Sequence, residues 1–212
     1  MMNNPWKAVS LSDYENHMAL DSVQQLQALN QMMKGQLNQY DIQSAMILGI
    51  AGGNGLEHVD TERLTKVYGV DINTEYLAAT KERYKNLSGV LECLCVDLNH
   101  ETEKLPQVEL LIANLLIEYI GYECFQKAAK RTDAKYVSCI IQINTDDSFV
   151  SESPYLHAFD DIKQVHHQMD EQNLKGSMEA IGYRLIQTLE YLLPNGKKFV
   201  QLDFGKDNNL RK

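Results

Sequence analysis

The sequence predicts an α/β fold with a seven-stranded, mostly parallel sheet, an antiparallel C-terminal hairpin and helices on both faces. Between residues 45 and 143, short β-rich runs alternate with helical segments, which is the order that a parallel sheet requires. Most of these runs are apolar throughout, which is typical of strands buried on both faces. Near the end, two strand-like runs flank Pro194-Asn195-Gly196, a turn sequence that favours an antiparallel hairpin.

Length and composition indicate a single domain. The 212 residues, 44% of them hydrophobic, are enough for one well-buried core. We expect one domain over 1–212, in which 1–43 form an N-terminal helical cap segment and 44–212 form the core. No run reaches the roughly 18 apolar residues of a membrane span, and the first residues lack the order of a signal peptide. We therefore expect a cytoplasmic protein without a membrane partner.

Net charge and cysteine spacing argue against a nucleic-acid partner, a zinc site and a disulfide framework. The formal net charge of -9 disfavours a nucleic-acid partner, because affinity for nucleic acid depends largely on Lys and Arg that neutralise phosphates. The cysteines have neither the spacing of a zinc site nor that of a disulfide framework, and we expect no metal. They are Cys93, Cys95, Cys124 and Cys139. These patterns do not indicate the oligomeric state.

Two helices are expected before the sheet begins. The first covers about Asp13–Ala19. The second is rich in glutamine and has apolar residues at intervals of three and four between Val23 and Tyr40, so one of its faces should pack against another part of the chain. Capping-box spacing marks both starts, from Ser12 to Glu15 and from Ser22 to Gln25.

Strands and helices then alternate. We expect parallel strands at 45–50, 66–71, 90–97, 108–114 and 136–143, and hairpin strands at 183–193 and 197–204. One helix should begin near Gly55, a second should cover about Thr74–Tyr84, and a third should follow the fourth strand through Phe125 and Ala129. The crossovers between parallel strands should be right-handed.

Candidate ligand-binding residues lie at the ends of successive strands. Ligands of open α/β sheets bind outside the carboxyl ends of the strands. The first strand ends in the glycine-rich run Gly49–Gly55, where a ligand can approach the backbone. The second ends in Asp71, whose carboxylate can accept hydrogen bonds from both hydroxyls of a ribose. The third ends in Asp97 and Leu98, which can contact an adenine edge, and the fourth ends in Asn114.

These segments together resemble the class I S-adenosylmethionine-dependent methyltransferases, and the resemblance extends from about Ile47 to Phe204. The segments that carry it are Ile47–Gly55, Val70–Asn73, Val96–Asn99, Glu109–Leu115 and the terminal hairpin. The resemblance implies a Rossmann-like fold, S-adenosylmethionine as cofactor and S-adenosylhomocysteine as product. The cofactor contacts that we expect are Gly49, Ala51, Gly53, Asn54, Gly55, Asp71, Ile72, Asp97, Leu98, Asn114 and Leu115.

The sequence departs from the family's first motif at two positions. Gly49 stands where the family has an acidic residue, and Ala51 replaces the first glycine. The amino group of the methionine part should then be held by backbone carbonyls and by residues of the N-terminal segment. In addition, Asn114-Leu115-Leu116-Ile117 does not resemble the Asn-Pro-Pro-Tyr motif that acts on exocyclic base amines, which is a second argument against nucleic acid.

The implied reaction is a direct displacement at the sulfonium methyl group, in which positioning supplies much of the acceleration. If a general base is used, Glu118 and His17 are the catalytic candidates, and His157, His166 and His167 are further ones. Glu118 can equally be an acid that starts the next helix. Residues expected to contact the substrate or to form a lid are Tyr14, His17, Met18, Tyr119 and Tyr155. The polar segment 146–172 is either an insertion that covers the substrate or an ordinary surface connection.

Methyl transfer to a small-molecule acceptor is the function that we expect. One alternative is a non-catalytic partner module that keeps the cofactor fold. Another is an NAD(P)-dependent oxidoreductase, because Gly49, Gly53 and Gly55 also have the spacing of short-chain reductases. None of the eleven tyrosines has a lysine four residues later, and this absence disfavours the reductase class. The sequence leaves the acceptor and its nucleophilic atom open.

Overall fold

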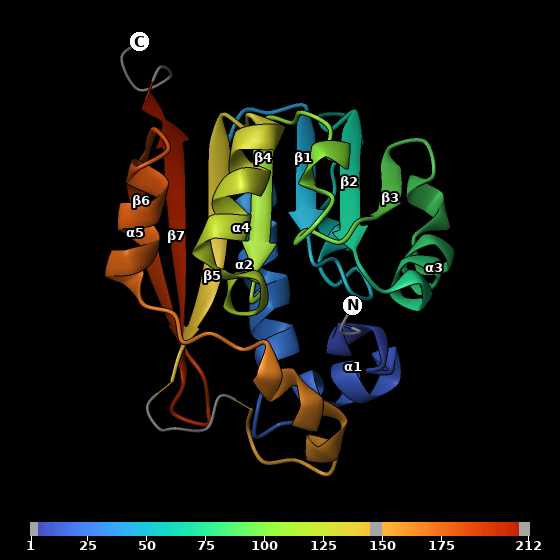
Figure 1. The fold of residues 1–212 in the computed structure, drawn as a ribbon. Coiled ribbons are helices and arrows are strands. Elements are labelled where there is room, and N and C mark those ends of the chain that lie inside the picture. Colours follow the sequence, from blue (N-terminus) through green and yellow to red (C-terminus); the bar gives the residue numbers. More distant parts are fainter. Residues whose placement is uncertain (1–3, 145–149, 208–212) are drawn as a thin grey trace.

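The computed structural model describes residues 4–144 and 150–207, and its strands form one seven-stranded sheet in the order β3-β2-β1-β4-β5-β7-β6 (Figure 1). The strands are β1 (Ser44–Leu48), β2 (Lys66–Asp71), β3 (Leu91–Cys95), β4 (Leu110–Asn114), β5 (Tyr136–Ile143), β6 (Tyr183–Leu192) and β7 (Lys198–Lys206). Strands β1 to β5 pair in parallel, whereas β7 is antiparallel to both β5 and β6. The predicted fold class is confirmed.

Helices cover both faces of the sheet. They are α1 (Leu11–Ala19), α2 (Gln25–Gln39), α3 (Thr74–Arg83), α4 (Ile117–Thr132) and α5 (Glu171–Glu179). Helices α4 and α5 pack on one face, and α2 and α3 pack on the other. Helix α1 lies beyond the carboxyl ends of the central strands, beside the 3₁₀ segment Leu156–Gln164 (Figure 1). Among residues 4–144 and 150–207, no helix combines the length and apolarity that a bilayer crossing requires.

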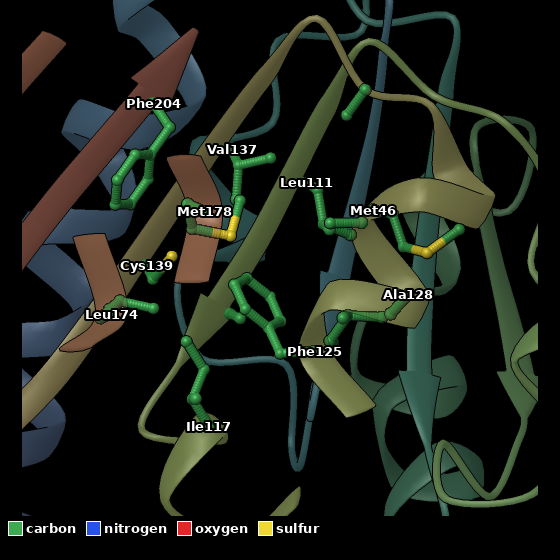
Figure 2. Packing of buried hydrophobic residues seen from close by; sticks show 14 of the residues in the cluster. Met46, Leu111, Ile117, Phe125, Ala128, Val137, Cys139, Leu174, Met178 and Phe204 are labelled. Atoms are coloured by element: carbon green, nitrogen blue, oxygen red, sulfur yellow. The ribbon is translucent and has the colours of Figure 1, made fainter. Parts of the chain in front are cut away.

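The apolar runs of the central strands divide between two hydrophobic clusters. Met46 and Leu48 of β1 belong to the cluster under α4 and α5, whereas Ala45 and Ile47 belong to the cluster under α2 and α3. Successive side chains of a strand point to opposite faces, so a strand covered on both sides needs apolar residues at every position. Figure 2 shows part of the first cluster, in which Phe125 of α4 lies among side chains of β4, β5 and α5.

A Phe125→Ala variant should lose about 3–5 kcal/mol of the free energy of unfolding, because the fully buried ring would leave a cavity in this cluster. Chemical denaturation with urea measures the loss. Lys127→Ala is the matched control, since Lys127 is exposed on the same helix and its truncation leaves the core intact. Equal stability of the two variants would contradict this assignment of the core.

The helix predicted to begin near Gly55 is absent, and this prediction was wrong. Only a 3₁₀ turn, Leu56–His58, follows the glycine-rich run before β2. The face that such a helix would cover is already occupied by α2, whose Met33 lies against Gly55. A Cβ atom on Gly55 would lie 2.8 Å from Cγ of Met33. The N-H groups of a helix N-terminus are therefore missing from this turn.

The two capping boxes before the sheet were also wrong. Helix α1 begins after Ser10, whose Oγ accepts a hydrogen bond from the backbone N of Asp13 at 3.1 Å. Helix α2 begins after Gln24, which has φ of 51° and makes no side-chain cap. Helix α2 is held by tertiary contacts instead, because tertiary packing provides most helical stability in proteins.

A buried polar network explains part of the glutamine content of α2. Nε2 of Gln36 donates to Oδ1 of Asn114 at 2.9 Å and to Oγ of Ser138 at 2.8 Å. Ser138 in turn donates to the buried carboxylate of Asp203, which also accepts from the hydroxyl of Tyr40 at 3.0 Å. The network joins α2 to β4, β5 and β7, and it fixes the side chain of Asn114 at the end of β4.

Candidate active site

Three adjoining cavities lie at the carboxyl ends of the strands, under α1 and the N-terminal segment, and Tyr14 lines all three. The first cavity lies at the ends of β1, β2 and β4 and beside the residues that follow β3. Its lining includes most of the predicted cofactor contacts, namely Gly49, Ala51, Asp71, Ile72, Asp97, Leu98, Asn114 and Leu115. These residues come from four separate strand ends, and the fold brings them together as predicted for an open α/β sheet.

Asp71 ends β2 and presents a largely buried carboxylate to the first cavity. Its Oδ2 accepts a hydrogen bond from the backbone N of Ala51 at 2.9 Å, and its Oδ1 accepts from the backbone N of Asn73 at 2.9 Å. Burial raises the pKa of this carboxyl above its ordinary value. Each carboxylate oxygen keeps a further lone pair, so Asp71 can still accept hydrogen bonds from two hydroxyls of a ligand.

Asp97 lies two residues beyond the end of β3, which stops at Cys95. Its Oδ1 accepts a hydrogen bond from the backbone N of Asn99 at 3.0 Å, and this bond closes a tight turn. The turn presents Leu98 and Asn99 to the first cavity as well. The side-chain acceptor and the neighbouring backbone are therefore both available to a flat heterocycle.

The glycine-rich run divides into a part that lines the cavities and a part that packs inward. Gly49 and Ala51 line the first and third cavities and have φ of 69° and 46°. Gly53 and Gly55 line none of the three cavities, and a Cβ on Gly53 would lie 2.7 Å from the Tyr84 ring. The contact role expected for Gly53 and Gly55 stays a prediction, whereas their packing role is evident.

The second cavity adjoins the first and contains Glu118. Its lining consists of Trp6, Tyr14, His17, Met18, Gln25, Leu115, Glu118, Tyr119, Gln142, Val150, Phe159 and His166. Oε1 of Glu118 accepts a hydrogen bond from the backbone N of Gln142 at 2.9 Å. Its Oε2 is buried and has no hydrogen-bond partner in the part of the chain that the structure describes. Burial raises the pKa of this carboxyl from 4.5 to about 7, which is typical of groups that exchange protons near neutral pH.

Of the histidines proposed as bases, the structure brings His17 and His166 into the second cavity. Nδ1 of His17 and Oγ of Ser153 are 2.7 Å apart, and burial lowers the pKa of both imidazoles. His157 is exposed beside Asp160, and neither His157 nor His167 lines any of these three cavities.

Of the residues expected to contact the substrate or to form a lid, most line the second cavity and one does not. Tyr14, His17, Met18 and Tyr119 line the second cavity. Tyr155 packs against the cluster of Val9, Phe159 and Ile162 and lines none of the three cavities. The described part of segment 146–172 supplies Val150, Phe159 and His166 to the second cavity, and residues 146–149 lie outside the described residues.

The third cavity lies over the glycine-rich run, between α1 and α2. Its lining consists of Tyr14, Glu15, Leu26, Leu29, Met33, Ile47, Gly49, Ile50, Ala51, Gly52, Asn54 and Asn114. The predicted contact Asn54 belongs here, and its amide donates to the backbone O of Leu26 at 2.9 Å. Helices α1 and α2 thus complete a site whose other wall is the sheet.

Several lining residues were not predicted because their position depends on the path of the N-terminal segment. Trp6 lines the first and second cavities, and its backbone O accepts a hydrogen bond from Nδ2 of Asn73 at 3.0 Å. The hydroxyl of Tyr76 donates to the backbone O of Val9 at 2.9 Å. These bonds fasten the segment over the end of β2. The single tryptophan of the chain, beside Pro5, is the one sequence signal that could have indicated this role.

The chain matches no protein-family model and no curated protein sequence. Its structure, however, is similar to many solved ones. It superposes on magnesium protoporphyrin IX methyltransferase from Synechocystis, solved with bound S-adenosylhomocysteine, with a TM-score of 0.64. The sequences are 11% identical, and the match covers 95% of this chain and 96% of that chain.

Two further structures have the same fold. The N-methyltransferase NodS from Bradyrhizobium japonicum, in complex with S-adenosylhomocysteine, gives a TM-score of 0.65 at 10% identity, over 96% of this chain and 99% of that chain. The [4+2]-cyclase SpnF gives a TM-score of 0.65 at 9% identity, over 87% and 82%. Strand order, the antiparallel hairpin and these superpositions agree, and the chain therefore has the fold of the class I S-adenosylmethionine-dependent methyltransferases.

Proposed function

We propose that this chain is an enzyme that transfers the methyl group of S-adenosylmethionine to a small-molecule acceptor and releases S-adenosylhomocysteine. The observation that carries the proposal is the meeting of three cavities at Tyr14, with Asp71 in the first and the buried carboxyl of Glu118 in the second. The three cavities can hold the adenosine, the methionine part and the acceptor of a methyl transfer side by side.

The residues of the first cavity fit an adenosine. Asp71 has free lone pairs for the two ribose hydroxyls, and the turn at Asp97 and Leu98 offers an acceptor and a backbone donor to an adenine edge. Tyr14 and Tyr76 add aromatic surface beside Asp71. The methionine part would then extend over Gly49 and Ala51 into the third cavity.

The acceptor would occupy the second cavity, whose walls are largely aromatic and apolar. Its enclosure between α1, α4 and the segment around Phe159 favours a small molecule over a macromolecule. Proteins of similar structure include a magnesium protoporphyrin IX methyltransferase and a geranyl diphosphate methyltransferase, both of which are named for small-molecule acceptors. The net charge of -9 gives no support to a nucleic-acid acceptor.

S-adenosylmethionine supplies an activated methyl group on a sulfonium. The chain's own residues hold the two reactants in line, which can contribute about 7–11 kcal/mol of acceleration. In such a transfer the acceptor's lone pair would form the new bond to the methyl carbon, the electron pair of the broken C–S bond would stay on sulfur, and Oε2 of Glu118 would take the acceptor's proton. That oxygen has no partner among the described residues, so it is free to take the proton.

Two other functions stay open to test. A non-catalytic module would keep the adenosine site without turnover, and the cyclase SpnF has the same fold although its name describes another reaction. A nicotinamide oxidoreductase would require affinity for a dinucleotide.

Ligand-induced stabilisation distinguishes these functions. S-adenosylhomocysteine at about 100 times its Kd should raise the free energy of unfolding by about 2.7 kcal/mol, because it binds the folded chain alone. NAD⁺ at equal concentration should leave the melting temperature unchanged. Differential scanning fluorimetry measures both effects. Stabilisation by NAD⁺ alone, or by neither ligand, would refute the proposed cofactor, and binding without turnover in an acceptor screen would favour the module.

A further inference from the structure

Glu15 is the one charged side chain among the described residues that line the third cavity. The remaining walls are the apolar side chains of α2 and β1, the backbone of the glycine-rich run, and the neutral groups of Tyr14, Asn54 and Asn114. The end of β1 adds no charge, because Gly49 stands there. A Cβ atom on Gly49, which has φ of +69°, would lie 3.1 Å from the Leu116 side chain. Any positively charged group in this cavity would therefore interact mainly with Glu15.

Arg83 of α3 fixes the carboxylate of Glu15. Its NH1 donates to Oε1 at 2.6 Å and its NH2 donates to Oε2 at 3.0 Å, so the pair is bidentate. NH1 also donates to the backbone O of Gly52 at 2.8 Å. The arginine thus ties α1 to α3 and to the glycine-rich run. Each oxygen of Glu15 keeps a lone pair that Arg83 does not use.

Gly52 permits this arrangement. An added Cβ atom at position 52 would lie 2.2 Å from Oε1 of Glu15 and 2.8 Å from NH1 of Arg83. Only glycine fits at position 52, because the ion pair of Glu15 and Arg83 packs directly against the backbone there. Glu15 is in consequence held against the floor of the third cavity rather than extended into solvent.

We propose that Glu15 binds the α-ammonium group of the methionine part of the cofactor, with Arg83 as the residue that positions it. The inference rests on the proposed function, since adenosine in the first cavity directs the amino-acid end towards the third. Glu15 then confers a preference for ligands with a free amino group. The negative charge that binds the ammonium group then comes from the N-terminal segment instead of from the end of β1.

The test uses two ligands that share adenosine and sulfur. S-adenosylhomocysteine carries the α-ammonium and carboxylate, whereas 5′-methylthioadenosine lacks both. Glu15→Gln should weaken the binding of S-adenosylhomocysteine about tenfold or more, because a charge-assisted hydrogen bond is lost. It should change the affinity for 5′-methylthioadenosine less than about twofold. Isothermal titration calorimetry measures each Kd, and thermal unfolding checks that the variant is folded.

Arg83→Gln is the matched control, because it breaks the same ion pair and leaves the charge of Glu15. It should reduce the affinity for S-adenosylhomocysteine less than Glu15→Gln does. If both variants lose affinity for both ligands equally, Glu15 only ties α1 to α3. If the affinities are unchanged, Glu15 does not contact the ligand. Either result overturns the inference and leaves the proposed function standing, whereas failure of both ligands to bind the unchanged chain overturns both.

Discussion

Asp71→Ala is expected to weaken the binding of S-adenosylhomocysteine about 100-fold. Two hydrogen bonds from ribose hydroxyls to a charged carboxylate would be lost, at about 1.5 kcal/mol or more each. The carboxylate also orders the glycine-rich run through the backbone N of Ala51, so its removal loosens the first cavity as well. Isothermal titration calorimetry gives the change in Kd.

Asp71→Asn and Glu92→Gln serve as controls for this prediction. Asp71→Asn keeps one acceptor oxygen and should fall between the unchanged chain and Asp71→Ala. Glu92 lies on the edge strand β3, pairs with Lys66 at the surface and contacts none of the cavities, so its variant should bind normally. Undiminished affinity in Asp71→Ala would remove the ribose assignment.

Glu118→Gln is expected to stabilise the protein at pH 8 by about 3 kcal/mol and to have little effect at pH 4. Burial raises the pKa of Glu118 in the folded chain from 4.5 to about 7. Between these values the folded chain keeps a proton that the unfolded chain has released, so the free energy of unfolding falls as pH rises. A neutral amide removes that loss. Urea denaturation from pH 4 to pH 8 measures the difference.

Glu123→Gln is the matched control, since Glu123 is exposed on the same helix and its variant should follow the unchanged chain at every pH. A stable Glu118→Gln variant would show that this carboxyl is retained at a cost in stability, as proton-transfer groups often are. A Glu118→Gln variant that is less stable at pH 8 than at pH 4, relative to the unchanged chain, would mean that the carboxylate is ionised and paired.

Much of the fold follows from side-chain alternation alone. Runs such as Ala45–Leu48 carry apolar residues on both faces, and only a sheet covered by helices on both sides buries them all. The Pro194–Gly196 turn likewise determined the closing hairpin. At β3 the expectation of two-sided burial did not hold, because it is an edge strand and its side chains are half-buried or exposed.

Local patterns failed where a distant segment decided the outcome. The sequence predicts a helix from about Gly55, but α2 takes the space that this helix would need. Such competition between segments cannot be read from one stretch of sequence.

In the candidate site, too, some residues could be predicted from the sequence and others could not. Asp71 and Asp97 could be predicted because parallel strands align their carboxyl ends on one edge of the sheet. Trp6 and Glu15 could not, because they reach the cavities from the N-terminal segment, whose path over the sheet is not set by the strand order. Glu118 was predicted from its place after β4, but its buried and unpartnered oxygen became evident only in the structure.

A crystal structure of the protein with S-adenosylhomocysteine would show directly whether the three cavities hold the cofactor as proposed. Both ribose hydroxyls should lie on Asp71, the adenine beside Asp97 and Leu98, and the thioether sulfur near Tyr14, where the three cavities meet. The methionine part should lie over Gly49 and Ala51, and the sulfur should face the cavity of Glu118. A ligand bound outside the first cavity, or with its sulfur directed away from the second, would rule out this binding mode.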